Sequence, residues 1–272
     1  MLQATPFSSR PALPRPLWTL GLGAVLLLSA CASRPPESAP TSTAPVTATP
    51  AVPQVAAPPA PGTGAANPEA GFARWVEGFK ASARRAGISE ATLQAAFDEV
   101  QFLPQLIELD RAQPEFNRPV WDYLDRAITP QRVANGQRKL QQVRAEADAA
   151  AARYGVPASI LAGFWGMESD FGRNYGNTSV IDALATLGYE GRREAWARGE
   201  LLAALKILQN GDIDRAHMIG SWAGAMGQTQ FMPSIFLAYA VDADGDGRRD
   251  IWGSMADVMA STVNFVAHSG WQ

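Results

Sequence analysis

The spacing of apolar residues limits the fold more than any other feature of this sequence. From residue 71 onward apolar residues recur every three or four positions, which is the period of an amphipathic helix. One stripe comprises Phe72, Trp75, Val76 and Phe79, and a second, after a helix cap at Ser89, comprises Leu93, Ala96, Phe97 and Val100. No stretch shows the sustained alternation of a β-strand. The sequence therefore predicts a mainly α-helical domain whose folded part begins near Gly71.

A helix that begins at Pro157 carries a carboxylate, Glu168, near its end. Gly155 suits the position after one helix, and Pro157 suits the first position of the next. Apolar residues then follow at helical spacing, namely Ile160, Leu161, Phe164 and Trp165. Glu168 lies four residues after Phe164 and three after Trp165, so we expect it on the apolar face of this helix.

The surroundings of Glu168 decide whether it can act as a general acid. Burial disfavours the charged carboxylate and raises its pKa, so a buried glutamate keeps its proton near neutral pH. The residues alone leave a second interpretation open, a helix-end glutamate satisfied by backbone donors or an arginine. Asp170 lies two residues further and points away while the helix continues, so the second carboxylate of a glycosidase pair would have to come from elsewhere. We expect the helix to end at Ser169 and Asp170.

Charge and cysteine content exclude several classes of protein. The net charge of −3 over 272 residues gives no electrostatic case for nucleic-acid binding. A single cysteine excludes a disulfide framework and a zinc site built from cysteines. His217 and His268 are too isolated to suggest metal or nucleophilic catalysis.

Residues 1–30 have the features of a lipoprotein export signal. Two arginines precede an apolar run over residues 17–28 that is too short to span a bilayer comfortably. The run ends at Leu28-Ser29-Ala30-Cys31, which resembles the bacterial lipobox, where cleavage leaves a lipid-bearing cysteine at the new N-terminus. An ordinary cleavage site with an incidental cysteine is the alternative. Because Ala32 rather than Asp follows Cys31, the resemblance implies a lipid anchor at the periplasmic face of the outer membrane.

Residues 31–70 are predicted to form a disordered tether. Ten of the twenty prolines lie between residues 32 and 70, together with many Ala, Thr and Ser residues and few charges. Such a composition buries too little apolar surface to fold, and its prolines keep the chain extended.

A glycine-rich run from Gly220 to Ser234 is the other segment of unusual composition. Its small residues allow close approach of backbone or ligand, and it contains several amide and hydroxyl side chains. We expect this run to form the wall of a groove that binds a neutral polar ligand.

Three motifs in these segments stand in the order of a known family. They are Gly166-Met167-Glu168-Ser169-Asp170-Phe171-Gly172-Arg173, Asp182-Ala183-Leu184-Ala185-Thr186-Leu187 and Gly224-Ala225-Met226-Gly227-Gln228-Thr229-Gln230-Phe231-Met232-Pro233-Ser234. Together they resemble the lytic murein transglycosylase B family, glycoside hydrolase family 103, of the membrane-bound lipoprotein type. The resemblance runs from about residue 71 to residue 272 and implies a lysozyme-like α+β catalytic fold.

The resemblance also implies an activity and its substrate. Members cleave the β-1,4 bond between N-acetylmuramic acid and N-acetylglucosamine of peptidoglycan without water, leaving 1,6-anhydromuramoyl ends. Peptidoglycan glycan strands are then the partner, with cell-wall synthesis or remodelling proteins as further ones, and the chemistry needs no cofactor. Two alternatives remain open: a hydrolytic muramidase of the same fold, with Asp182 as the base for water, and a non-catalytic peptidoglycan-binding lipoprotein.

Several residues take their expected roles from this resemblance. Glu168 is the sole catalytic acid/base, and the residues implied in substrate binding are Ser221, Gln230, Arg192, Arg193, Trp196, Phe231 and Asn264. The sequence departs from the family pattern at Phe265, where a tyrosine is expected after Asn264. It also stops at Gln272, where family members continue, so we expect a truncated domain.

A short acidic run begins like a calcium-binding EF-hand loop. Asp242, Asp244 and Asp246 occupy positions 1, 3 and 5, Gly247 occupies position 6, and Arg248 occupies position 7, which supplies a backbone carbonyl. Position 12 is Gly253 instead of glutamate, and the resemblance offers Asp257 as the closing carboxylate. The sequence therefore predicts a structural Ca²⁺ site, with ordinary turn chemistry as the alternative.

The lipobox makes a prediction about membrane association. Cys31→Ala removes the only thiol that could carry the lipid, so the protein should move from the outer-membrane fraction to the soluble periplasmic fraction. Fractionation and immunoblotting check this, with Ser33→Ala as a control. Continued sedimentation of the Cys31→Ala protein with outer membranes would refute the lipobox interpretation.

Overall fold

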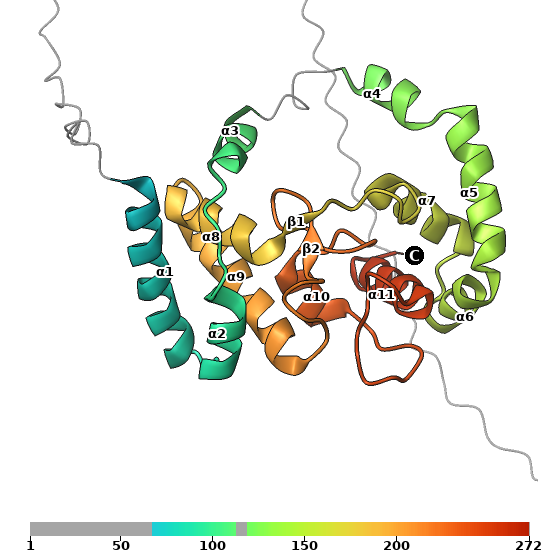
Figure 1. The fold of residues 1–272 in the computed structure, drawn as a ribbon. Coiled ribbons are helices and arrows are strands. Elements are labelled where there is room, and N and C mark those ends of the chain that lie inside the picture. The colour runs from blue at the N-terminus through green and yellow to red at the C-terminus, as the bar shows by residue number, and fades with distance from the viewer. Residues whose placement is uncertain (1–66, 113–118, 272) are drawn as a thin grey trace, which may run out of the picture. The chain divides into compact units, whose positions relative to one another are not determined.

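The structure is a computed structural model that describes residues 67–112 and 119–271. The predicted export signal, Cys31 and nearly all of the predicted tether lie outside these residues. The elements in the described residues are, in chain order, α1 (Pro68–Arg85), α2 (Glu90–Phe97), α3 (Pro104–Ala112), α4 (Val120–Ala127), α5 (Pro130–Gln142), α6 (Arg144–Tyr154), α7 (Ala158–Ser169), β1 (Thr178–Ser179), α8 (Val180–Glu190), α9 (Glu194–Asn210), β2 (Ile219–Gly220), α10 (Pro233–Tyr239) and α11 (Met255–His268) (Figure 1).

The prediction of a mainly helical domain is confirmed. The two strands pair antiparallel, with Thr178 opposite Gly220, and form the only sheet of the described residues. Their role is local, because they fasten the start of α8 to the beginning of the glycine-rich run. None of the helices in the described ranges combines the length and the apolar character that crossing a membrane requires.

Helix α8 is the centre of the first of two apolar cores. Every residue from Val180 to Gly188 is buried. Helix α9 packs along α8, while α1 and α3 contact α8 and α2 and α10 contact α9. Asp182, inside this core, accepts a hydrogen bond from the Arg215 guanidinium at 2.6 Å, so its charge is compensated.

The second core joins α7 to α6 and α11. Leu161 and Trp165 of α7 are 1% and 5% exposed and pack with Ala147 of α6 and with Val258 and Val263 of α11. Burying a side chain such as Leu161 contributes about 1.5–3 kcal/mol to folding. This packing fixes the helix that carries Glu168.

Three features of the helices differ from the sequence predictions. The first helix begins at Pro68, three residues before Gly71, because Asn67 caps it through the backbone N–H of Glu69. The pair Thr129-Pro130 predicts the start of one long polar helix running toward Tyr154, but this helix is broken at Val143, which is buried in the second core. The proline-containing stretch after residue 103 contains α3, which the sequence did not indicate.

Two glycines allow α5 and α7 to approach one buried aromatic ring. A β-carbon on Gly166 would lie 2.7 Å from Cζ of Phe171, and one on Gly136 would lie 2.8 Å from the same atom. Phe171 is 6% exposed and cannot move without disturbing Trp165, whose ring it meets edge-on. The contact between α5 and α7 therefore requires residues without a side chain at both positions.

This packing predicts opposite effects for two substitutions in one helix. Gly166→Ala should lower the free energy of unfolding by about 1–3 kcal/mol, because the added methyl overpacks against Phe171. Gly163→Ala should raise it by about 0.5–1 kcal/mol, because nothing lies within 4 Å of its added methyl and alanine favours a helix. Urea unfolding of both variants measures this, and equal effects would contradict the assigned packing.

Candidate active site

Helix α7 ends where the sequence predicts, and a strained turn follows it. Ser169 is the last helical residue, and Asp170, Phe171 and Gly172 have φ values of 49°, 61° and 77°. A positive φ is uncommon for a bulky residue such as phenylalanine and costs about 1–3 kcal/mol. The backbone N–H of Phe171 donates to the Trp165 carbonyl at 3.1 Å, which helps to hold the turn. The chain thus turns away directly after Glu168, and Asp170 lines a different hollow from Glu168.

Glu168 lies at a pocket of about 220 Å³ between α7, residues 228–235 and α11. Most of the wall is apolar, and its apolar members are Phe164, Trp165, Phe231, Met232, Ile235 and Phe265. The polar members are Gln228, Thr229, Gln230 and Thr262. Among the described residues, Glu168 is the only carboxylate that lines this pocket.

Glu168 lies on a different face of its helix from the one that the sequence predicts, but its pKa is raised as expected. The buried residues of α7 include Leu161 and Trp165, whereas Phe164 is 37% exposed and Glu168 is also exposed. Glu168 therefore projects into the pocket instead of the core. The surrounding apolar wall still displaces water on one side, and this desolvation raises the pKa of Glu168 above its ordinary value.

A buried glutamine joins the Glu168 helix to the opposite side of the pocket. Gln228 is 8% exposed, and its Oε1 accepts a hydrogen bond of 2.8 Å from Nε1 of Trp165. Its Nε2 donates to the Trp252 carbonyl at 2.8 Å, and its backbone N–H donates to the Ile251 carbonyl at 2.9 Å. Gln228 stands inside the third motif, but its neighbours in the sequence predict no role for its side chain. Its partners lie 63 and 24 residues away, so no local pattern could reveal them.

Gln230 and Phe231 lie in the pocket, as the resemblance implied. Gln230 has a φ of 51°, and its Nε2 donates to the carbonyl oxygens of Tyr175 and Gly227 at 3.1 and 3.0 Å. These bonds fix the side chain in the wall and leave Oε1 available to a ligand. Phe231 packs against Phe265, with ring centroids 5.5 Å apart.

Two residues implied in substrate binding do not line this pocket. The Oγ of Ser221 accepts a hydrogen bond from the backbone N–H of Ala225 at 3.1 Å and so shapes the glycine-rich loop. The side-chain amide of Asn264 donates to the Tyr239 carbonyl at 2.9 Å, where it satisfies the end of α10. Thr262 and Phe265, on the same helix as Asn264, line the pocket instead.

The other implied binding residues also lie away from the pocket. Arg192 and Arg193 both pair with Asp110 of α3, which is 2% exposed. The Arg193 guanidinium lies 3.7 Å from the ring centroid of Trp196. This arrangement fastens α3 to the start of α9, a contact that the sequence could not indicate because α3 was not predicted.

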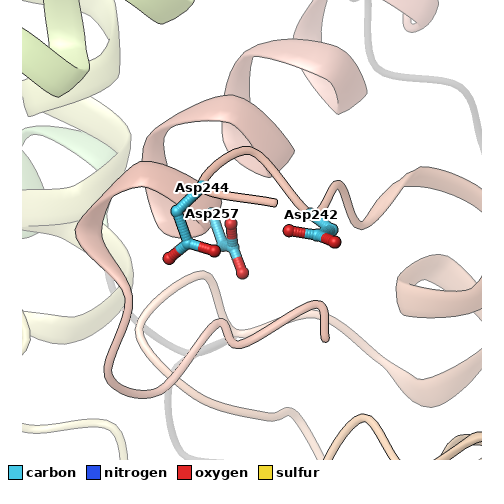
Figure 2. Close-up of side chains that lie close together, drawn as sticks. All are labelled: Asp242, Asp244 and Asp257. Carbon is cyan, nitrogen blue, oxygen red and sulfur yellow. The ribbon is translucent and has the colours of Figure 1, made fainter. Parts of the chain in front are cut away.

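The acidic run brings three carboxylates together. One carboxylate oxygen from each of Asp242, Asp244 and Asp257 lies within 4.8 Å of the others (Figure 2). Asp257 comes from the first turn of α11, and its two oxygens accept hydrogen bonds of 2.7 Å from the backbone N–H groups of Ala243 and Asp250. Asp257 thus joins both ends of the acidic run, at residues 243 and 250, to α11.

The remaining members of the predicted metal set lie outside this cluster. Asp246 is not among the three gathered carboxylates, and its Oδ1 accepts a hydrogen bond of 2.8 Å from the backbone N–H of Arg248. The spacing of an EF-hand loop predicts a ligand at Asp246, but its carboxylate bonds within the turn. Three hard oxygen donors still form a set that suits Ca²⁺.

The fold and the pocket define a lysozyme-like domain with one desolvated carboxylate in a cleft lined by aromatic and amide groups. The Transglycosylase SLT domain family matches residues 71–272, and the chain belongs to this family. Membrane-bound lytic murein transglycosylase B of Escherichia coli (strain K12) is 39% identical over 150 residues, which are 55% of this chain and 41% of that protein.

Solved structures of lytic transglycosylases have folds similar to that of this chain. SltB3 from Pseudomonas aeruginosa, in complex with NAG-anhNAM-pentapeptide, is 53% identical with a TM-score of 0.71, and the match covers 74% of this chain and 53% of that one. Escherichia coli Slt35, in complex with calcium, is 32% identical with a TM-score of 0.64, and the match covers 74% of this chain and 64% of Slt35. The chain spans about half the length of these relatives.

The raised pKa of Glu168 predicts how stability depends on pH. Below the ordinary pKa of glutamate, Glu168 is protonated in both the folded and the unfolded protein, so its titration does not affect the free energy of unfolding. As the pH rises, Glu168 ionises first in the unfolded protein, and the free energy of unfolding falls. Glu168→Gln removes this titration, so its stability relative to the unsubstituted protein should rise as the pH increases above the ordinary pKa of glutamate, about 4. Urea unfolding at a series of pH values on both sides of this pKa provides the measurement.

Glu90→Gln is the control of opposite sign. The hydrogen bond from Arg84 lowers the pKa of Glu90, so this variant should lose stability relative to the unsubstituted protein as the pH rises to the ordinary pKa of glutamate, about 4, and the difference should stay constant above it. A pH-independent difference for Glu168→Gln would show that the fold does not desolvate Glu168.

Proposed function

We propose that this domain is a lytic transglycosylase of peptidoglycan. It cleaves the β-1,4 bond between N-acetylmuramic acid and N-acetylglucosamine and forms 1,6-anhydromuramoyl ends. The observation that carries the proposal is the single carboxylate of the pocket, Glu168, whose pKa is raised by desolvation and which has no hydrogen-bond or ion-pair partner among the described residues. The ligands of a relative agree, since SltB3 from Pseudomonas aeruginosa forms complexes with NAG-NAM-pentapeptide and with NAG-anhNAM-pentapeptide, which has the anhydro end that the proposed reaction forms.

One carboxylate is sufficient for both steps of this reaction. Protonated Glu168 first donates its proton to the leaving glycosidic oxygen as the bond to the anomeric carbon breaks. The resulting carboxylate then accepts the proton of the C6 hydroxyl of the muramic acid, whose oxygen forms the new bond to the anomeric carbon. The proton balance closes, because Glu168 ends in the state in which it began. The acetamido group of the substrate stabilises the charge that develops between the two steps.

The position of Asp182 argues against the hydrolytic alternative. A muramidase that activates water would need a second carboxylate facing the substrate. Asp182 lies in the core of α8, is 6% exposed, and its Oδ1 accepts hydrogen bonds from Arg215 and from the backbone N–H of Gln101. It does not line the Glu168 pocket.

The proposal predicts the loss of one product. Glu168→Gln keeps the shape of the side chain but can neither donate nor accept the proton, so the release of anhydro-muropeptides should fall by about 10²- to 10⁴-fold. Mass spectrometry of muropeptides released from purified peptidoglycan measures both rate and product identity. Glu108→Gln, an exposed glutamate of α3, serves as the matched control and should retain full activity.

The other outcomes would support a different function or refute the mechanism. Products with a free reducing end would identify a hydrolase. Binding of peptidoglycan without any released product would support a non-catalytic binding protein. Release of anhydro products by Glu168→Gln at the rate of the unsubstituted protein would refute the single-carboxylate mechanism.

We further propose that Asp242, Asp244 and Asp257 hold a structural Ca²⁺. An ion that binds only the folded state raises the melting temperature with its occupancy, by about 3–6 °C at ten times the dissociation constant. Asp244→Asn should abolish this Ca²⁺-dependent rise, whereas Asp246→Asn in the same turn should keep it. Melting curves with millimolar Ca²⁺ or a chelator decide the matter, and an unchanged melt would assign the segment to plain turn structure.

The proposed function includes a lipid anchor at Cys31. This anchor would tether the domain at the periplasmic face of the outer membrane, within reach of peptidoglycan. The name of the membrane-bound Escherichia coli relative supports attachment to a membrane.

A further inference from the structure

A second hollow lies on the other side of the turn that follows α7, and the acid-base steps do not use it. We call it the arginine groove. It has a volume of about 600 Å³, and its charged side chains are Arg126, Arg132, Arg138, Arg173 and Asp170. They come from the end of α4, from α5 and from the turn after α7, and α5 and α7 lie side by side (Figure 1).

The charges of the arginine groove are unbalanced. It has four guanidinium groups and one carboxylate, although the whole chain carries a net charge of −3. Asp170 pairs with Arg173 at 2.5 Å and lies 3.9 Å from Nε of Arg132. Neither Arg126 nor Arg138 forms an ion pair with a carboxylate in residues 67–112 or 119–271. Several cations around one hollow raise the local concentration of anions and favour an anionic ligand.

Arg132 builds the wall of the groove, whereas Arg126 and Arg138 border its open side. The guanidinium of Arg132 donates to the Gly166 carbonyl at 2.9 Å and to the Ala127 carbonyl at 3.3 Å, which ties α5 to α7 and α4. Arg126 and Arg138 are exposed. These two residues can therefore be changed without breaking the packing around α7.

Residues 173–175 lie between the arginine groove and the Glu168 pocket. Arg173 of the groove also lines a polar hollow of about 450 Å³, which Tyr175 lines as well. The carbonyl of Tyr175 accepts the hydrogen bond from Gln230, which is part of the Glu168 pocket. A ligand in the pocket could thus extend along residues 172–177 to the arginines.

We propose that the arginine groove binds carboxylate groups of the peptide stem on the glycan strand that Glu168 cleaves, an inference that rests on the proposed function. A pentapeptide joined to the sugar through its N-terminus retains a free C-terminal carboxylate. Guanidinium groups bind carboxylates through paired, charge-assisted hydrogen bonds. The side chains of Gln131, Asn135 and Asn174 add donors and acceptors for the peptide backbone.

The shape of the site favours a peptide over a membrane surface. Anionic lipids attract clusters of basic residues beside an inserted apolar face. The arginines here surround a hollow lined by polar amides, next to the proposed cleavage site. A short acidic peptide fits this shape, and a bilayer does not.

A binding comparison tests the proposal without any turnover. The full chain is titrated calorimetrically at low ionic strength with NAG-anhNAM-pentapeptide and with the peptide-free disaccharide NAG-anhNAM. The unsubstituted protein should bind the peptide-bearing ligand about 5- to 30-fold more tightly, which corresponds to two exposed charge-assisted contacts. Arg126→Gln with Arg138→Gln should bring this ratio close to one, and added salt should lower it in the unsubstituted protein.

The control variant removes the same charge elsewhere. Arg153→Gln with Lys206→Gln should keep the ratio, which excludes an effect of net charge. The proposal is overturned if the unsubstituted protein shows no preference, if both ligands weaken equally in the groove variant, or if the control also loses the preference. Binding to anionic phospholipid vesicles that depends on Arg126 and Arg138, with an unchanged ligand ratio, would assign the groove to a membrane and also overturn it. Because both ligands resemble products, the result stands even if no cleavage is detected.

Discussion

The buried side chain of Gln228 is the contact on which the geometry of the site depends. One end of its amide accepts a hydrogen bond from Trp165, a turn before Glu168, and the other end donates to the Trp252 carbonyl beyond the acidic loop. A buried amide loses its hydration, so both bonds must be made for the fold to tolerate it. The single side chain thus sets the distance between the helix that carries Glu168 and the opposite wall of the pocket.

Strain is concentrated around this contact. The three non-glycine residues with positive φ in the described part of the chain are Asp170, Phe171 and Gln230, which lie in the turn after α7 and in the facing wall. Local packing offsets the strain, because Phe171 fills the space left by two glycines and Gln230 hydrogen-bonds two carbonyls. This turn also decides which groups each of two nearby carboxylates faces. The turn separates Glu168 from Asp170, so that one carboxylate faces the pocket and the other faces arginines.

Local sequence signals predicted much of the fold. The cap at Ser89, the glycine at 155 and the end of α7 at Ser169 lie where residue preferences place them. Two of the motifs that resemble the transglycosylase family located Glu168, Gln230 and Phe231, which the fold brings together. The same resemblance suggested contact roles for Arg192, Arg193 and Trp196, but the structure pairs these arginines with Asp110.

The sequence by itself determined the helical class of the domain, the helix that presents Glu168 and the segment that faces it, because capping, glycine positions and apolar periodicity act over a few residues. Tertiary structure decided which side of α7 is buried, which carboxylates of the acidic loop gather and which side chains line the pocket. These outcomes depend on partners far along the chain, such as Gln228 with Trp165 and Asp257 with Ala243. Close packing selects such pairs by volume and hydrogen-bond geometry, and neither quantity is present in local sequence.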